Sequence, residues 1–512
     1  MLSQMADIGE KIIKFIAVAL LILITVLMLF YQNNIVMNIT EASVVTKNNW
    51  SMLLFVIVLM VLYGCVCILL KRISASCLFV VLAAIYLVGG LYIITHIYMT
   101  QICDAGMCYN NAKLMLEGDY RGFLPGEYFY EHPHQLGLLL YDCILILVCN
   151  KVNFIYCVNL IWVLGGIFFL WHSVNIQKDD VLVAKITVLF AFTFFPQFLF
   201  IFFAYGLVPG LGCLLASLYF ASIYMKNKKM IWQVMSLLFI AFACLVRTNY
   251  TIAGIAMIII LILSVFREDK QSRWRGVVVI ISLIFALTIP KILLNKGFEL
   301  ITHADLSQGM PMSLYVAMGL QEDDVRAAGW YSGFNHDTYI ASGCDVEVSS
   351  MIAKKAIEER LDFFVNNPRE AFEFFSEKII TTWCEPTYQS VWSGPLIGVT
   401  GKTDVLWLQE FYSGGDNYNV FSFVMNGINI IILGFAAFAL LWNLFKEKRS
   451  IGSLNLFCVL FFVGGFLFHL IWETKSQYVY PYVVCLLPVT ARGAKIIYFD
   501  IVSAYKHQKI EK

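Results

Sequence analysis

The sequence predicts an all-α, polytopic membrane protein, and three observations carry that prediction. The 512-residue chain is 60% hydrophobic and only 14% charged, and a water-soluble globule of this size could not bury so much apolar surface. Apolar runs long enough to cross a bilayer recur along the chain. Basic residues cluster after alternate runs, as they do in cytoplasmic loops. The lipid bilayer is therefore the first expected partner.

About twelve transmembrane helices are expected, because a spanning helix needs about 20 apolar residues. The first run, Ile12 to Tyr31, is followed by no small-residue cleavage site, so it is interpreted as a retained helix and not as a signal peptide. The runs are centred in 12–31, 50–70, 74–98, 154–174, 182–203, 207–225, 230–248, 250–266, 276–294, 420–445, 451–472 and 479–498.

The positive-inside rule orients these helices, with both termini in the cytoplasm. The segments 99–153 and 295–419 then face outward. The apolar stretch 135–150 is short for a span, and a further crossing there would put basic loops on opposite sides, so we expect a helix lying on the outer face. The loops that carry the orientation contain Lys71–Arg72, Lys226–Lys229, Arg267–Arg275, Lys446–Arg449 and the Lys-rich tail.

The same pattern divides the chain into three parts. Residues 1–294 form an N-terminal transmembrane module that includes the outer loop 99–153, residues 295–419 form an extracytoplasmic segment, and residues 420–512 form C-terminal transmembrane helices with a cytoplasmic tail. The net charge of +1 is spread over loops, which excludes a nucleic-acid partner.

A polar, aromatic island from Asp104 to His134 interrupts the apolar sequence and is the expected place for chemistry. Asp104 precedes a short amphipathic helical pattern, so it could cap that helix, act as a general base at the membrane boundary, or do both. Glu131, His132, Pro133 and His134 close the island; they are either a ligand site or ordinary interfacial residues.

The island resembles the first outer loop of the glycosyltransferase family 39 and aminoarabinose-transferase group, membrane enzymes related to protein O-mannosyltransferases, here in a Gram-positive branch. Two later segments, Tyr205–Pro209 and Glu473–Tyr482, resemble helix starts of the same group. The matching island residues are Asp104, Tyr109, Ala112, Met115, Leu116, Gly118, Asp119, Tyr120, Gly126, Glu127, Tyr128, Phe129, Glu131 and Pro133.

The resemblance implies a GT-C fold with outer-face interfacial helices, a polyprenyl-phosphate sugar as donor and an extracytoplasmic acceptor. In such an enzyme Asp104 would activate the acceptor hydroxyl, and the anomeric carbon would be inverted. Two departures stand out: Ala105 replaces the usual second acidic residue, and His132 stands where many relatives have a lysine that is thought to contact phosphate.

Candidate substrate-binding residues lie at the outer ends of spans. Arg247 and Lys475 could bind the lipid phosphate or simply anchor helix ends. Because both are permanently charged, they are better candidates than His132 for the phosphate-binding residue. The full set is Glu131, His132, Arg247, Glu473, Lys475 and Tyr478. The fourteen cysteines show no ligand spacing, so no metal site is expected; no cofactor is implied with certainty, and a divalent cation is left open.

The short cytoplasmic loops also limit the class of sugar donor, because they cannot hold the nucleotide-binding domain that a nucleotide-sugar enzyme needs. The donor is therefore expected to be a lipid-phosphate-linked sugar. The expected function is a glycosyltransferase in the cell membrane with its site on the extracytoplasmic face. A transporter or flippase of a polyprenyl-linked glycan suits the same helix count, although clear repeats and broken helices are missing from the sequence. A non-catalytic assembly subunit is the third possibility.

Overall fold

The computed structural model describes residues 2–177, 181–268, 273–448 and 450–501. Over these residues the chain is an all-α polytopic membrane protein with ten helices long and apolar enough to span a bilayer. The ten are α1 (Leu2–Phe30), α2 (Trp50–Leu70), α3 (Ala75–His96), α7 (Val152–Ile176), α10 (Leu207–Asn227), α12 (Thr251–Arg267, extended to 20 residues by the 3₁₀ turn Thr248–Tyr250), α13 (Arg273–Thr302), α19 (Asp416–Trp442), α20 (Ser453–Ile471) and α21 (Ser476–Lys495).

Two of the twelve expected spans are not among these ten, one because it is bent and the other because it is short. The run at 182–203 is a bent pair, α8 (Val181–Thr193) and α9 (Pro196–Leu199) with a 3₁₀ turn to Phe202, and the two halves meet at 53°. Pro196 has no backbone N–H and disfavours helical geometry in the residue before it, so the helix breaks there. The run at 230–248 is α11 (Met230–Val246), only 17 residues long.

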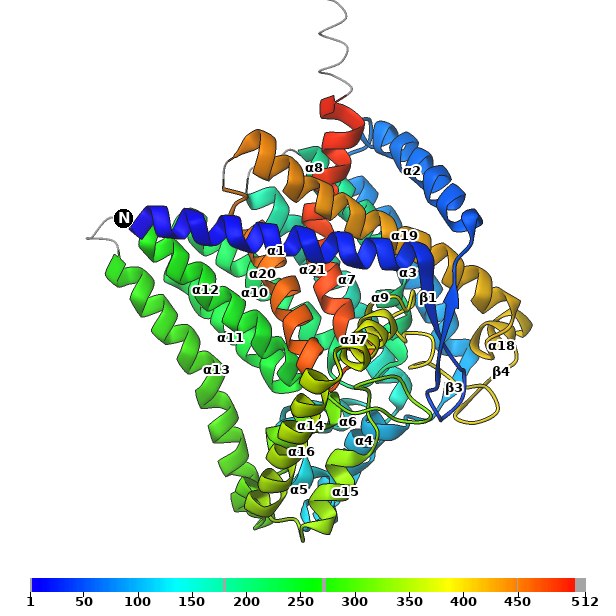
Figure 1. The fold of residues 1–512 in the computed structure, drawn as a ribbon, viewed down its shortest axis with the longest axis vertical. Coiled ribbons are helices and arrows are strands. Elements are labelled where there is room, and N and C mark those ends of the chain that lie inside the picture. The colour runs from blue at the N-terminus through cyan, green and yellow to red at the C-terminus, as the bar shows by residue number, and fades with distance from the viewer. Residues whose placement is uncertain (1, 178–180, 269–272, 449, 502–512) are drawn as a thin grey trace, which may run out of the picture.

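The helices are arranged around α20 and α21, which lie in the middle of the bundle, while α2 and α13 lie at its edges (Figure 1). Most of α21 is buried, whereas α2, α3 and α13 leave most of their side chains uncovered. A peripheral helix with an apolar outer surface is what a bilayer-facing position requires. The expected interfacial helix is α6 (Leu136–Val148), whose 13 residues reach only about 20 Å and cannot cross a bilayer.

The polar segments fold into short helices and strands at one end of the bundle. Asp345 caps the helix that ends at Asn366, and Pro368 occupies the first position of the next helix, where a missing N–H is tolerated. These elements are α4 (Cys103–Leu116), α5 (Tyr128–Glu131), α14 (Met312–Gly319), α15 (Phe334–Ala341), α16 (Val346–Asn366), α17 (Pro368–Trp383), α18 (Leu406–Tyr412), β1 (Tyr31–Ile35), β2 (Ser43–Lys47), β3 (Ile97–Met99) and β4 (Gly401–Thr403).

The polar segments 99–153 and 295–419 and the β1–β2 hairpin are joined by hydrogen bonds. Strand β3 pairs antiparallel with β4, and the β1 residue Asn33 donates its N–H to the Cys384 carbonyl, 2.9 Å away. The Met310 N–H donates to the Glu131 carbonyl at the same distance. Segments 31–49, 99–153 and 295–419 therefore form one layer at the end of the bundle.

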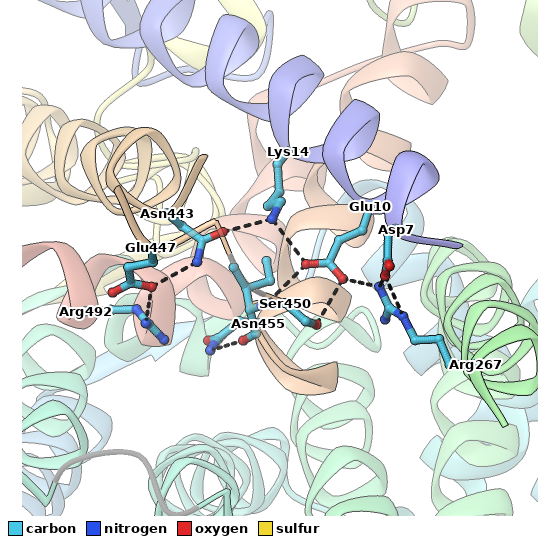
Figure 2. Close-up of polar contacts among 10 residues, drawn as sticks. Asp7, Glu10, Lys14, Arg267, Asn443, Glu447, Ser450, Asn455 and Arg492 are labelled. Carbon is cyan, nitrogen blue, oxygen red and sulfur yellow. Dashed lines mark hydrogen bonds and ion pairs between the residues drawn. The ribbon is translucent and has the colours of Figure 1, made fainter. Parts of the chain in front are cut away.

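An ion-pair network around the buried side chains of Glu10 and Lys14 holds the opposite end together (Figure 2). Arg267 at the end of α12 bonds Asp7 and Glu10 of α1, at 2.9 and 2.7 Å, and Glu10 accepts a further bond from the Ser450 hydroxyl. Lys14 donates to Asn443 after α19 at 2.8 Å. The N-terminus and the basic segments after α12 and α19 thus share one side, as the charge pattern predicted.

Candidate functional site

Asp104 lies in the first turn of α4 with an exposed side chain. Its capping role is not confirmed: Ile102 occupies the N-cap position, and no side-chain bond caps this helix. The helix begins two residues earlier than the sequence suggested, so the carboxylate is free for another partner. That partner is Tyr205, whose hydroxyl donates to Asp104 Oδ2 at 3.0 Å.

Tyr205 is the centre of the hydrogen-bond network around Asp104. Its hydroxyl also accepts a bond from Gln135 Nε2 at 2.7 Å and lies 3.3 Å from the Tyr128 hydroxyl. The next residue, Gly206, has a φ of +73°, and a Cβ there would meet the Val246 carbonyl oxygen at 2.2 Å. Only glycine allows this approach, which brings Tyr205 against the end of α11.

Arg247 follows directly after α11 and is 5% exposed. Its guanidinium lies over the Tyr205 ring at 4.2 Å and the Tyr478 ring at 5.3 Å, and its one hydrogen bond is a 3.5 Å contact to the Tyr205 carbonyl oxygen. No carboxylate lies within 4 Å of it among the residues that the structure describes. Most of its five donors are therefore free to bind an anion.

Lys475, by contrast, is already paired. Its ammonium forms a 2.7 Å ion pair with Glu41, which is 2% exposed and also accepts a bond from Gln389 Nε2 at 2.8 Å. Glu41 comes from the turn of the β1–β2 hairpin, a segment in which the sequence showed no functional pattern. The pair holds Lys475 beside Asp104, within Coulombic range, and Glu41 compensates its charge.

Glu473 lies in the short connection between α20 and α21. Backbone hydrogen bonds join this connection to the segment 295–419. The Glu473 N–H donates to the Tyr315 carbonyl at 3.2 Å, and the Thr474 N–H donates to the Gly329 carbonyl at 3.0 Å. The Glu473 carboxylate accepts a 3.3 Å bond from the Tyr478 hydroxyl. Burial raises the pKa of Glu473 to about 7 although Lys475 lowers it, so a proton can be held there near neutral pH.

The histidine end of the island lies against α14 and α15. His132 Nδ1 is 2.8 Å from the Tyr315 hydroxyl, and burial lowers the pKa of His132 to about 4 against the opposing effect of Asp104. The imidazole is therefore neutral at physiological pH, which does not suit it to hold a phosphate. Glu131 pairs with His336 at 2.9 Å, and burial raises the pKa of this carboxyl.

Strained backbone surrounds this site. Eight residues other than glycine have positive φ in the described part of the chain, and four of them belong to its immediate surroundings: Glu41, Cys103, Tyr388 and Gln389, with φ between +49° and +58°. Such conformations cost roughly 1–3 kcal/mol each and persist where the surrounding structure requires them. Here they orient the pair of Lys475 with Glu41 and the start of α4.

The residues singled out from the sequence thus fall into two groups. Asp104 is within Coulombic range of Arg247, Glu473, Lys475, Tyr478 and His132. These five residues come from three separate parts of the chain: the loop after α5, the end of α11, and the start of α21 with the connection before it. Glu131 forms the second group: its carboxylate pairs with His336 at 2.9 Å and lies 3.8 Å from His132 Nε2, which links it to the first group. The sequence analysis missed Tyr205 as the partner of Asp104, and it missed Glu41 entirely.

The described residues contain no cluster of three or more His, Cys, Asp or Glu side chains arranged to hold a metal ion. The chemistry available at the site is that of a carboxylate and an unpaired guanidinium on either side of one tyrosine. In comparisons with known proteins, no family model, no curated protein and no solved structure matches this chain. The fold and the site define its class as a polytopic membrane protein with a polar site at one end of its helices.

Proposed function

We propose that this chain is a GT-C membrane glycosyltransferase, which moves a sugar from a polyprenyl-phosphate donor to an extracytoplasmic acceptor. One observation carries the proposal: Tyr205 joins an exposed carboxylate, Asp104, to Arg247, a buried cation that has no acidic partner among the described residues. Transfer from a sugar phosphate needs both groups, a base for the attacking hydroxyl and positive charge for the departing phosphate.

The reaction can be written with these residues in defined roles. The acceptor oxygen attacks the anomeric carbon while its proton passes to Asp104, and the carbon–oxygen bond to the phosphate breaks with inversion. The bonding electrons leave with the phosphate, and the Arg247 guanidinium offsets the charge that develops on it. Lys475 contributes a further positive charge, reduced by its pairing with Glu41.

Loop lengths favour a lipid-linked donor over a nucleotide sugar. At the end opposite the site, α10 and α11 are joined by Lys228 and Lys229 alone, and a nucleotide-binding domain needs far more chain. A polyprenyl phosphate can instead present its sugar at the membrane boundary. The acceptor, a wall polymer, a glycolipid or a protein, would approach through the layer formed by segments 99–153 and 295–419, on the extracytoplasmic face of the cell membrane.

A transfer assay tests this proposal. Purified protein in nanodiscs is supplied with radiolabelled polyprenyl-phosphate hexoses and a membrane extract as acceptor source, and release of polyprenyl phosphate is followed. We expect consumption of at least one donor, with Lys113→Gln as a control variant because Lys113 contacts only the Tyr109 ring on the far part of α4. Absence of consumption across the donor panel would contradict the enzyme assignment.

One observation favours the alternative of a transporter or flippase. The bent pair α8–α9 is a broken span of the kind that transporters place at their substrate sites. In this chain the break has a local explanation, because Pro196 interrupts the helix. Gln101 then bonds the Phe202 carbonyl and the Ala204 N–H, which fixes the chain just before Tyr205. Movement of a polyprenyl-linked glycan across proteoliposomes without any acceptor would support the transporter instead.

A further inference from the structure

Lys291 and Asn295 lie on the peripheral helix α13, near the C-terminal end of its long apolar run. Lys291 and Asn295 are one helical turn apart and therefore share a face. Their neighbours Ile292 and Leu293 are 59% and 66% exposed, as expected of side chains in contact with lipid. A basic residue inside a span is expensive to keep in a membrane, and such residues commonly mark substrate pathways.

Neither Lys291 nor Asn295 has all of its polar atoms hydrogen-bonded within the described structure. Lys291 makes no hydrogen bond and no ion pair there, and Asn295 Oδ1 is buried without a partner. A lysine that merely anchors a helix end extends toward water. Lys291 instead lies within Coulombic range of Cys244 on α11 and of His134 before α6, which are neighbours on the protein side.

His134 connects this face to the site. The imidazole lies within Coulombic range of both Lys291 and Arg247, and the His134 carbonyl accepts a 3.4 Å bond from the Thr248 hydroxyl, next to Arg247. Two cations that have no acidic partner in the described part of the chain therefore approach one histidine, the first from a lipid-facing helix and the second from the site. An anion bound between them would compensate both charges.

We propose that Lys291 and Asn295 bind the phosphate of a lipid-linked donor at the membrane side of the site, and that the donor reaches Arg247 past His134. This inference rests on the proposed function, because it takes its donor class from there. The lipid source follows from the position of Lys291: a prenyl chain can stay in the bilayer beside Ile292 and Leu293 while its phosphate meets the ammonium, whereas a soluble sugar phosphate would not approach a lipid-facing helix.

Binding of polyprenyl phosphate to the full chain in nanodiscs tests this proposal without requiring turnover. We expect Lys291→Gln to weaken the binding by about tenfold or more, the usual worth of a charge-assisted hydrogen bond, and Lys291→Arg to restore most of it. The matched control is Lys296→Gln, since Lys296 lies on the same helix but is exposed and paired with Glu299. It should bind as the wild type does. Asn295→Leu should weaken binding by a smaller factor.

Three probes separate the sources of phosphate. Polyprenol without phosphate should not compete, inorganic phosphate should compete only at far higher concentration, and phosphatidylglycerol should compete weakly. Equal affinity of Lys291→Gln and wild type, or equal competition by inorganic phosphate or phosphatidylglycerol, would overturn the inference. Failure of this inference is distinguishable from failure of the proposed function. If polyprenyl phosphate binding depends on Lys291 but no sugar is transferred, only the glycosyltransferase assignment is refuted. If sugar is transferred at the same rate with and without Lys291, only the role of Lys291 is refuted.

Discussion

Replacement of Arg247 should separate binding of the donor from stability of the fold. The guanidinium is buried, makes one 3.5 Å hydrogen bond and has no acidic partner among the described residues. Arg247→Met keeps the apolar stem against Tyr205 and Tyr478 but removes the charge. Two hydrogen bonds to a charged phosphate are worth about 1.5–3 kcal/mol each, so donor affinity or turnover should fall by at least about tenfold and by more than 100-fold if both are lost.

Stability should respond in the opposite way. Removing an unpaired buried charge relieves a desolvation penalty of several kcal/mol, while the contacts with the two rings are worth about 0.5–2 kcal/mol each. We therefore expect an unchanged or higher melting temperature for Arg247→Met. The control is Lys475→Met, which leaves Glu41 buried without its ion pair and should cost about 3–5 kcal/mol.

The assay combines thermal unfolding in detergent with titration of polyprenyl phosphate. Arg247→Met should bind poorly and unfold at or above the wild-type temperature, whereas Lys475→Met should unfold well below it. If Arg247→Met is destabilised as strongly as Lys475→Met and binds polyprenyl phosphate like the wild type, Arg247 has a structural role and our account of the cation is wrong.

Three further predictions concern orientation and protonation. Single-cysteine variants should show an impermeant reagent reaching position 355 but not position 228 in intact cells, and the reverse result would invert the topology. Burial raises the pKa of Glu473 to about 7 from 4.5, so ionisation destabilises the fold as pH rises through that interval. Glu473→Gln should therefore raise the melting temperature at pH 8, with a gain in unfolding free energy of at most about 3 kcal/mol, and should have little effect near pH 4.5. An equal effect at both pH values would refute this prediction. Since the pKa of His132 is lowered to about 4, His132→Gln should leave the pH profile of activity unchanged between pH 6 and 8, and loss of a titration there would show that His132 carries charge.

Much of the fold could be predicted because lipid imposes simple rules on sequence. Apolar runs longer than about 18 residues identify spans, and the basic clusters correctly grouped the N-terminus with the ends of α12 and α19. Asn367-Pro368 marked a helix boundary because proline cannot continue a preceding helix. The bend in α8–α9 was missed, since a single proline near the end of an apolar run is compatible with a straight span.

The site was harder to predict because its contacts cross long distances in sequence. The exposed position of Asp104 before a helix suggested a cap equally well, and only the tertiary structure reveals Tyr205 as its partner. Glu41 is a single acidic residue in a polar loop, which has no pattern to distinguish it. The one local signal was Tyr205–Gly206 at the start of a span: glycine beside an aromatic residue indicates a close approach, although not what approaches.

Single-turnover transfer by wild type and Asp104→Asn tests the central claim most directly. Asparagine is close in shape to aspartate and can still accept a hydrogen bond from the Tyr205 hydroxyl, but it cannot take up the acceptor proton. We predict normal expression, an unchanged melting temperature and polyprenyl phosphate release slower by about 10²-fold or more. Release at the wild-type rate by Asp104→Asn would show that this carboxylate is not the base.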